Sequence, residues 1–248
     1  MRKSTKIWLI IAAVLAVVGI AFCIAGAACG VSLSELRDIP FYRERIREHE
    51  GTDRDDFEFS QDFDGIEKLD LEIDVTEMTI TESQDGSFHV YGSHLGKSFE
   101  CRQDGKTLKL KSEREFFLSA GREETITIEV PKGTVFQKVE MEVGVGSLEA
   151  EWLDCEKLKL ECGVGSVLVN GQIRDGGEIE CGVGEVVLAL DNKEEDFDYK
   201  VSCGIGSVLV GENSYSGIPG EKKIDNGAGR KMEIECGIGS VAVTFEGE

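Results

Sequence analysis

The chain has 248 residues, of which 30% are charged and 41% are hydrophobic, a balance that suits a folded chain with one main domain. Its 48 acidic residues against 27 lysines and arginines give a formal net charge of −21, and no basic patch is visible in the sequence. A surface of this sign repels phosphate, so the composition excludes nucleic-acid binding.

The N-terminus predicts a membrane anchor. Residues 1–6 contain Arg2, Lys3 and Lys6, and residues 7–29 contain no charged residue. At about 1.5 Å per residue, a helix over residues 7–29 is about 34 Å long, which is enough to cross a bilayer core of about 30 Å. The positive-inside rule keeps residues 1–6 in the cytoplasm and exports the acidic body. We therefore expect a single-pass plasma-membrane protein with its C-terminal body outside the cytoplasm.

Two other interpretations of this segment stay open. The apolar region of a cleaved signal peptide normally has about 7–15 residues, and this one is longer, although Ala25-Gly26-Ala27 is a passable cleavage pattern. A lipoprotein needs an aliphatic residue before the small residues that precede its cysteine. Cys29 has a glycine at that place, so the lipoprotein interpretation is weak.

Residues 30–62 are predicted to form a juxtamembrane helix and a linker. Ser32 and Glu35 have the spacing of a capping box, and Pro40 kinks or divides the helix. The helix either docks on a partner beside the membrane or forms a stalk that caps the body, and the stalk is favoured. Alternating phenylalanines mark the start of β structure. They are Phe57, Phe59 and Phe63.

The remaining residues, 63–248, are built from repeats. Each copy has an alternating strand, a Gly-Val/Ile-Gly-Ser/Glu segment and a second alternating strand, as in Lys157 to Asn170 (KLKLECGVGSVLVN). Successive copies are 19, 19, 22 and 33 residues apart, and such periods are typical of stacked repeats. The first glycines of the copies are Gly144, Gly163, Gly182, Gly204 and Gly237.

Leu69 to Glu82 carries the same template in degenerate form. In both versions the apolar residues step by two, slip once by three and step by two again. The steps keep side chains on one face of a strand, and the slip lets the second strand face inward after a bend. The bend falls at Gly165-Ser166, and at Thr76-Glu77 in the early copy. We expect the interior of a coil to be filled by Leu158, Leu160, Cys162, Val164, Val167 and Val169.

Turn signals and breaks in the pattern place the other segments. Short strands are expected at Ser87–Tyr91, Thr107–Lys111 and Thr125–Val130. Loops are expected at Glu113–Glu124, Asp191–Asp198 and Gly211–Arg230.

Two architectures fit the repeat. In a solenoid each repeat of about 19–22 residues is one coil, whereas in a meander Gly165-Ser166 is a type II′ hairpin turn. Thr76 takes the glycine's place in the early copy, and a β-branched residue is poor at the positive φ of that turn. We therefore predict an all-β, β-helix-like solenoid, preceded by one transmembrane helix and a short juxtamembrane helix.

Four of the eight cysteines occupy one repeat position, which is valine or isoleucine in other copies. This interchange is typical of a buried small hydrophobe, and the absence of a C-x₂-C pair argues against a zinc site. Disulfides are conceivable on an exported protein, but stacked neighbours have nearly parallel side-chain vectors, which suit disulfide geometry badly. We expect free buried thiols at Cys162, Cys181, Cys203 and Cys236.

No catalytic, cofactor-binding or metal-binding residue is assigned. The Gly-Val-Gly segment lacks the next glycine of a dinucleotide loop, because that position is Leu168, and a strand follows it. His89 and His94 lack acids or cysteines at ligand spacing and are expected at the surface. Five glutamates are expected to face outward in one column, where weak Ca²⁺ binding is a hypothesis. They are Glu72, Glu142, Glu161, Glu180 and Glu235.

A membrane helix followed by TITIEVPKG (Thr125 to Gly133) and by LECGVGSVLVNG-type repeats resembles the bacterial "putative adhesin" domain of unknown function. That family is common in membrane proteins of Gram-positive bacteria, and the resemblance covers roughly Phe63 to Glu248. It implies a right-handed β-solenoid-like body and roles at the cell envelope or in envelope sensing. It implies no catalytic residues, because the family has none agreed.

Two classes of function remain open. The first is a structural, adhesive or protein-interaction module at the cell envelope, with an unknown protein or cell-wall partner. The second is a membrane-tethered envelope sensor or a regulatory partner of another membrane protein. Residues 1–6 are too short to hold an output domain, which favours the first class. Because no nucleophile–base set is visible, we do not expect an enzyme.

Overall fold

The computed structural model of the protein describes residues 57–113, 124–216 and 221–247. Within these residues no helix is long and apolar enough to span a membrane. The predicted cytoplasmic tail and transmembrane helix lie outside the described residues, and so does the juxtamembrane segment up to residue 56. The first strand begins at Phe57, which confirms that the alternating phenylalanines mark the start of β structure and moves the boundary of the body from residue 63 to residue 57.

The described chain is nearly all β, as the alternating pattern predicts. Thr125–Val130 has the predicted bounds, and the strands predicted near Ser87 and Thr107 are present with slightly different ends. The expected loop Asp191–Asp198 contains one short 3-10 helix, η1 (Glu194–Asp196). The strands are β1 (Phe57–Phe63), β2 (Lys68–Glu82), β3 (Phe88–Leu95), β4 (Glu100–Asp104), β5 (Thr107–Ser112), β6 (Thr125–Val130), β7 (Val135–Leu190), β8 (Asp198–Val210), β9 (Asn213–Ser216), β10 (Glu221–Ile224) and β11 (Lys231–Phe245).

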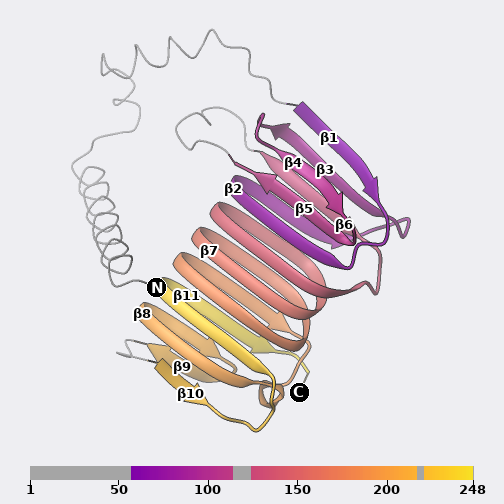
Figure 1. Ribbon diagram of the computed structural model, residues 1–248. Helices are drawn as coiled ribbons and strands as arrows, with labels where there is room; N and C mark the ends of the chain where they lie inside the picture. The colour runs from indigo at the N-terminus through magenta and orange to yellow at the C-terminus, as the bar shows by residue number, and fades with distance from the viewer. Residues whose placement is uncertain (1–56, 114–123, 217–220, 248) are drawn as a thin grey trace, which may run out of the picture. The chain divides into compact units, whose positions relative to one another are not determined.

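The repeats form parallel coils stacked in register, which confirms the solenoid and excludes the meander (Figure 1). β7 runs without a break through successive coils, and β2 lies parallel beside its first coil. Ile73 pairs with Val143 before the bend, and Met78 pairs with Leu148 after it. Residues at equivalent positions of the early copy and of the first later repeat are therefore neighbours in the sheet. Each coil has a first side before the bend and a second side after it.

The interior is filled by the predicted apolar positions, with one exception. Leu158, Leu160, Cys162, Val167 and Val169 are all buried. Val164 was expected beside them, but 49% of its surface is exposed. The prediction was wrong because the chain turns between Gly163 and Gly165, and this carries the side chain between them to the outside of the bend.

Glycines at the bend allow neighbouring coils to touch through their backbones. A Cβ on Gly163 would lie 2.6 Å from the carbonyl oxygen of Gly144, and one on Gly165 would lie 2.0 Å from that of Gly146. Real Cβ atoms do not approach a backbone oxygen so closely. The glycines are thus required by close stacking, as expected, and not by a ligand.

The coils do not stack in the order of the sequence. β11, the last strand of the chain, lies between the end of β7 and β8, so Cys236 pairs with Cys181 on one side and with Cys203 on the other (Figure 1). After β7 the chain leaves the stack, forms β8 at the far end, and returns to fill the space between them.

Both ends of the stack are covered by antiparallel strands. β10 pairs with the first side of β8, and β9 pairs with its second side. At the other end β4 covers β5, while β3 and then β1 cover β6. The expectation of one long loop over Gly211–Arg230 was therefore wrong. NSYS and EKKI are too short to show a periodicity, and they become strands because the exposed edge of β8 pairs with them.

The expected surface loop Glu113–Glu124 lies largely outside the described residues. Its last residue, Glu124, is buried and 1% exposed. The Glu124 carboxylate accepts hydrogen bonds from Thr76 Oγ1 at 3.1 Å, from the Ser112 hydroxyl, and from the Gly96 backbone N–H at 3.2 Å. These contacts fix the point at which β6 begins.

Candidate functional site

The outward faces of the coils carry columns of like side chains, because in-register stacking repeats each position at about 4.8 Å. The predicted glutamate column is confirmed: Glu72 pairs with Glu142, and Glu180 pairs with Glu235. Lys111 at one end contacts Glu72 at 2.9 Å. Burial, followed by the charges of the glutamates around it, raises the pKa of Glu180. The carboxylates of the glutamate column therefore repel one another, and neighbouring lysines offset this repulsion only in part.

No metal centre forms from these acids. Among the residues that the structure describes, no group of three or more His, Cys, Asp or Glu side chains is arranged to hold a metal ion. The carboxylates lie side by side along a flat face instead of converging on a point.

The cysteine column lies inside the stack, as predicted. Cys162, Cys181, Cys203 and Cys236 are all buried, and each of the six described cysteines is free of disulfides. Burial raises the pKa of Cys236 to about 11, whereas the hydrogen bond between Cys162 and Cys181 lowers the pKa of Cys162 and raises that of Cys181. All four side chains are buried inside the stack, so this column serves packing.

Two cysteines that the repeat pattern could not place now have positions. Cys155 is buried, and Cys101 on β4 is half-buried against the core. Burial raises the pKa of each thiol to about 12, so these two groups are also protonated at neutral pH.

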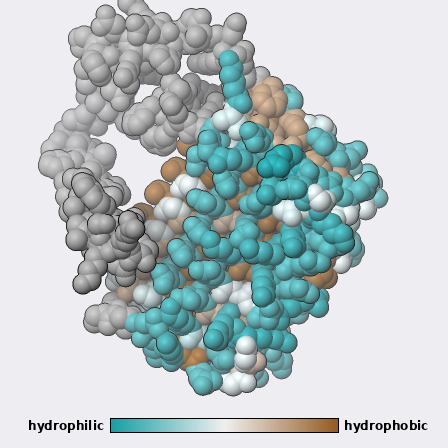
Figure 2. Space-filling model, in the orientation of Figure 1, coloured by the Kyte–Doolittle hydropathy of each residue, from teal (hydrophilic) through white to brown (hydrophobic). Residues whose placement is uncertain are grey.

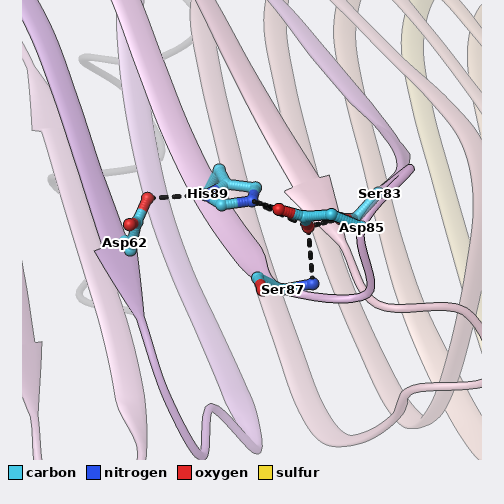
Figure 3. A network of polar contacts seen from close by, with 5 residues as sticks. All are labelled: Asp62, Ser83, Asp85, Ser87 and His89. Carbon is cyan, nitrogen blue, oxygen red and sulfur yellow. Dashed lines mark hydrogen bonds and ion pairs between the residues drawn. The ribbon is translucent and has the colours of Figure 1, made fainter.

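His89 joins three segments at the N-terminal end of the stack (Figure 3). Its Nδ1 lies 2.6 Å from Asp62 Oδ1 on β1, and its Nε2 lies 3.0 Å from Asp85 Oδ1 in the turn before β3. Ser83 Oγ and the Ser87 backbone N–H each donate to the same Asp85 oxygen at 2.9 Å. Hydrogen bonds to Asp62 and then Asp85 raise the pKa of His89. That of Asp85 is lowered, first by the Ser87 N–H and then by His89.

The sequence interpretation missed this network. Asp85 is four residues before His89 and was visible, but Asp62 is 27 residues away and reaches His89 only because β1 pairs with β3. The Ser83 hydroxyl donates to Asp85 and not to His89, and both ring nitrogens of His89 already have carboxylate partners. The cluster of Asp62, Asp85 and His89 is therefore an ion-pair network that holds β1 against β3, and we call it the clasp.

The clasp predicts a pH dependence of stability. The folded-state pKa of His89 is above its ordinary value of 6.5, so its contribution is fully present below that value and is lost as pH rises through the folded pKa. Between about pH 6 and pH 9, the melting temperature of the wild type should fall more than that of His89→Gln, measured by circular dichroism. Asp62→Asn is the matched variant and should behave like His89→Gln. An unchanged pH profile in both variants would contradict the clasp.

A ridge of branched aliphatic side chains runs along the outside of the bend. We call it the bend ridge, and it contains one residue from each rung: Val75, Val145, Val164, Val183, Ile238 and Ile205, in stacking order. Val164 and Ile205 are 49% and 73% exposed. The ridge is about 24 Å long, since six rungs stack at about 4.8 Å. The face drawn in Figure 2 is mostly hydrophilic, so branched aliphatic side chains as exposed as Val164 and Ile205 in one column call for a function.

Comparisons with known proteins found a matching family model and several solved structures. A family model described as Toastrack DUF4097 matches residues 66–244. No curated protein matches the chain. A "putative cell adhesion protein" of Clostridium sporogenes is 17% identical with a TM-score of 0.52, covering 77% of this chain and all of that one. A "putative adhesin" of Bacteroides fragilis is 16% identical with a TM-score of 0.35, covering 75% of this chain and 97% of that one.

Proposed function

Since the chain belongs to the Toastrack DUF4097 family, whose function is unknown, we propose from its own surface that it is a non-enzymatic adhesive or protein-interaction module. We further propose that residues 7–29 anchor it in the plasma membrane and that the β body acts outside the cytoplasm at the cell envelope. The apolar, uncharged run of residues 7–29 supports the anchor.

The bend ridge is the observation that carries the interaction role. Val145, Val164 and Ile205 are exposed and the other three ridge residues are half-buried, although the same residue types fill the interior close by, as Val164 and the buried Val167 three positions later show. The stack presents these side chains on a scaffold fixed by backbone ladders, so a partner that binds the ridge does not have to order it first. A partner with a matching apolar strip would bury several branched side chains at once, each worth about 1.5–3 kcal/mol when fully buried.

A photo-crosslinking residue placed at position 164 in cells tests this role. We expect it to give a defined set of crosslinked partners, and the added change Ile205→Lys should reduce their yield, because a buried unpaired charge is costly. The matched control places the crosslinker at Lys132, which is highly exposed and far from the bend. Equal crosslinking from both positions, or none from position 164, would refute a binding role for the ridge. Capture of one dominant membrane protein would identify the module as part of a sensor.

A further inference from the structure

The first side of the coils has a second column, and it consists mainly of lysine. Lys68 pairs with Lys138, and Lys231 pairs with Gly176. Lys157 lies one 19-residue repeat after Lys138 and one before Gly176. The lysine column therefore has one gap, at Gly176, with a lysine on the rung at each side of it. The gap is imposed by packing, because a Cβ on Gly176 would lie 2.4 Å from the Lys231 carbonyl oxygen.

The gap forms a surface notch of about 410 Å³. Its lining contains four lysines, two acids and three glycines. They are Lys138, Lys157, Lys159, Lys231, Asp175, Glu178, Gly176, Gly177 and Gly229, together with Leu158. The charged side chains of the lining sum to +2, on a chain whose net charge is −21, and the acidic partners of two of its lysines, Glu140 and Glu161, lie beside it. Lysines that are scattered along the sequence therefore meet at this notch.

The ammonium groups of the notch are held loosely. Lys157 Nζ lies 3.2 Å from Asp175 Oδ2, Lys138 Nζ lies 2.7 Å from Glu140 Oε1, and Lys159 Nζ lies 2.5 Å from Glu161 Oε1. All six side chains of these pairs are more than a third exposed. Exposed ion pairs of this kind contribute about 0–1 kcal/mol, so a ligand can replace them at little cost. Lys231 forms no ion pair within the described part of the chain. The notch thus offers cations whose partners are weak.

We propose that the notch binds a phosphate group carried by a small polyol or by a lipid headgroup. Lys157 and Lys231 reach it from rungs about 10 Å apart, so their ammonium groups can converge on one tetrahedral anion. The glycine floor leaves room for the group that carries the phosphate. An extended polyanion does not fit, because Glu178 in the lining and Glu180 in the neighbouring glutamate column repel the next charges.

This site is separate from the bend ridge. Five residues of sequence lie between Lys157 and Gly163, where the bend begins, so substitutions in the notch leave the ridge unchanged. The two proposals can therefore fail independently. Crosslinking from position 164 reports on the ridge, and phosphate binding reports on the notch.

The test uses the full chain in dodecyl maltoside micelles, which contain no phosphorus. Phosphorus-31 NMR line broadening measures binding of sn-glycerol 3-phosphate and, in a second arm, of dihexanoylphosphatidylglycerol. We expect saturable broadening that weakens as NaCl rises from about 0.05 to 0.5 M, because salt screens the lysines. The double variant Lys157→Gln with Lys231→Gln should weaken binding by at least about tenfold, since each removes a charged hydrogen bond.

The matched control, Lys132→Gln with Lys223→Gln, removes the same charge from two highly exposed lysines outside the notch. It should bind within about twofold of the wild type, because only the distant net charge has changed. Lysine-dependent binding of sn-glycerol 3-phosphate identifies a soluble phosphate ester as the ligand. Lysine-dependent binding of dihexanoylphosphatidylglycerol alone identifies a lipid headgroup. No saturable binding in either arm, or equal weakening in both double variants, would overturn the phosphate site. All variants should melt alike, because every substituted side chain is at the surface.

Discussion

Replacing Gly165 with alanine is expected to lower the free energy of unfolding by more than about 4 kcal/mol, an exceptionally large effect for one methyl group. The added Cβ would lie 2.0 Å from the Gly146 carbonyl oxygen, and the obstructing atom is backbone on the next coil. Relief would require two coils to separate, which breaks the parallel ladder on both sides of the bend. Urea unfolding followed by circular dichroism measures the loss.

Gly86→Ala is the matched control for Gly165→Ala. Gly86 also has a positive φ, +79°, but a Cβ there meets nothing within 4 Å. Its loss should be only about 1–2 kcal/mol, the cost of a left-handed backbone for a residue with a side chain. Similar losses at both positions would show that backbone conformation, and not contact between coils, makes the bend glycines necessary.

Asn192→Ala is expected to cost roughly 2–5 kcal/mol, because it leaves two buried backbone groups without partners. Asn192 is 5% exposed and follows the end of β7. Its Nδ2 donates to the Ile173 carbonyl at 3.0 Å, and its Oδ1 accepts from the Ile173 N–H at 3.0 Å. The side-chain amide therefore continues the ladder of the coil at the place where the chain leaves it.

Asn170→Ala provides the comparison for Asn192→Ala. Asn170 is half-buried, and its amide makes one long hydrogen bond of 3.5 Å to the Ala150 carbonyl, so we expect a loss below about 1 kcal/mol. Asn192→Asp should fall between wild type and Asn192→Ala at neutral pH, since aspartate can accept from the Ile173 N–H but cannot donate. Thermal and urea unfolding of the three variants would reveal whether this order holds. Equal stability of Asn192→Ala and Asn170→Ala would contradict the role of the Asn192 amide in continuing the ladder at Ile173.

The sequence was sufficient to predict the cross-section of the coil. Steps of two and one slip of three are local signals, and they correctly gave the early copy and the later repeats the same template. In the structure this template pairs Leu69 with Val139 and Met78 with Leu148. Only the bend itself was misplaced, because glycines on both sides of Val164 allow the backbone to turn earlier than the periodicity indicates. A local pattern predicts which face a side chain takes where the backbone is regular, and it fails where glycine removes the restriction.

The order of the coils could not be predicted from the repeats. The copies around Cys181, Cys203 and Cys236 are nearly identical, so any of them can stack on any other in register. The notch could not be predicted for the same reason. It exists because Gly176 and Lys231, which are 55 residues apart in the sequence, become neighbours when β11 stacks on β7. The clasp at His89 was missed for a related reason, since Asp62 meets it only through strand pairing.

The position of β11 between β7 and β8 also determines when, during synthesis of the chain, folding of the stack can finish. Pairing within β2 and β7 uses residues made early, and these coils can assemble as the chain emerges. The coil formed by β8 has no parallel neighbour until the final segment, Lys231 to Phe245, has been synthesised and has moved into the space beside it. A ribosome that has not yet released Lys231 to Phe245 therefore keeps the rungs of β8 and β11 from forming. This half of the stack is completed only when β11 pairs with β7 on one side and with β8 on the other.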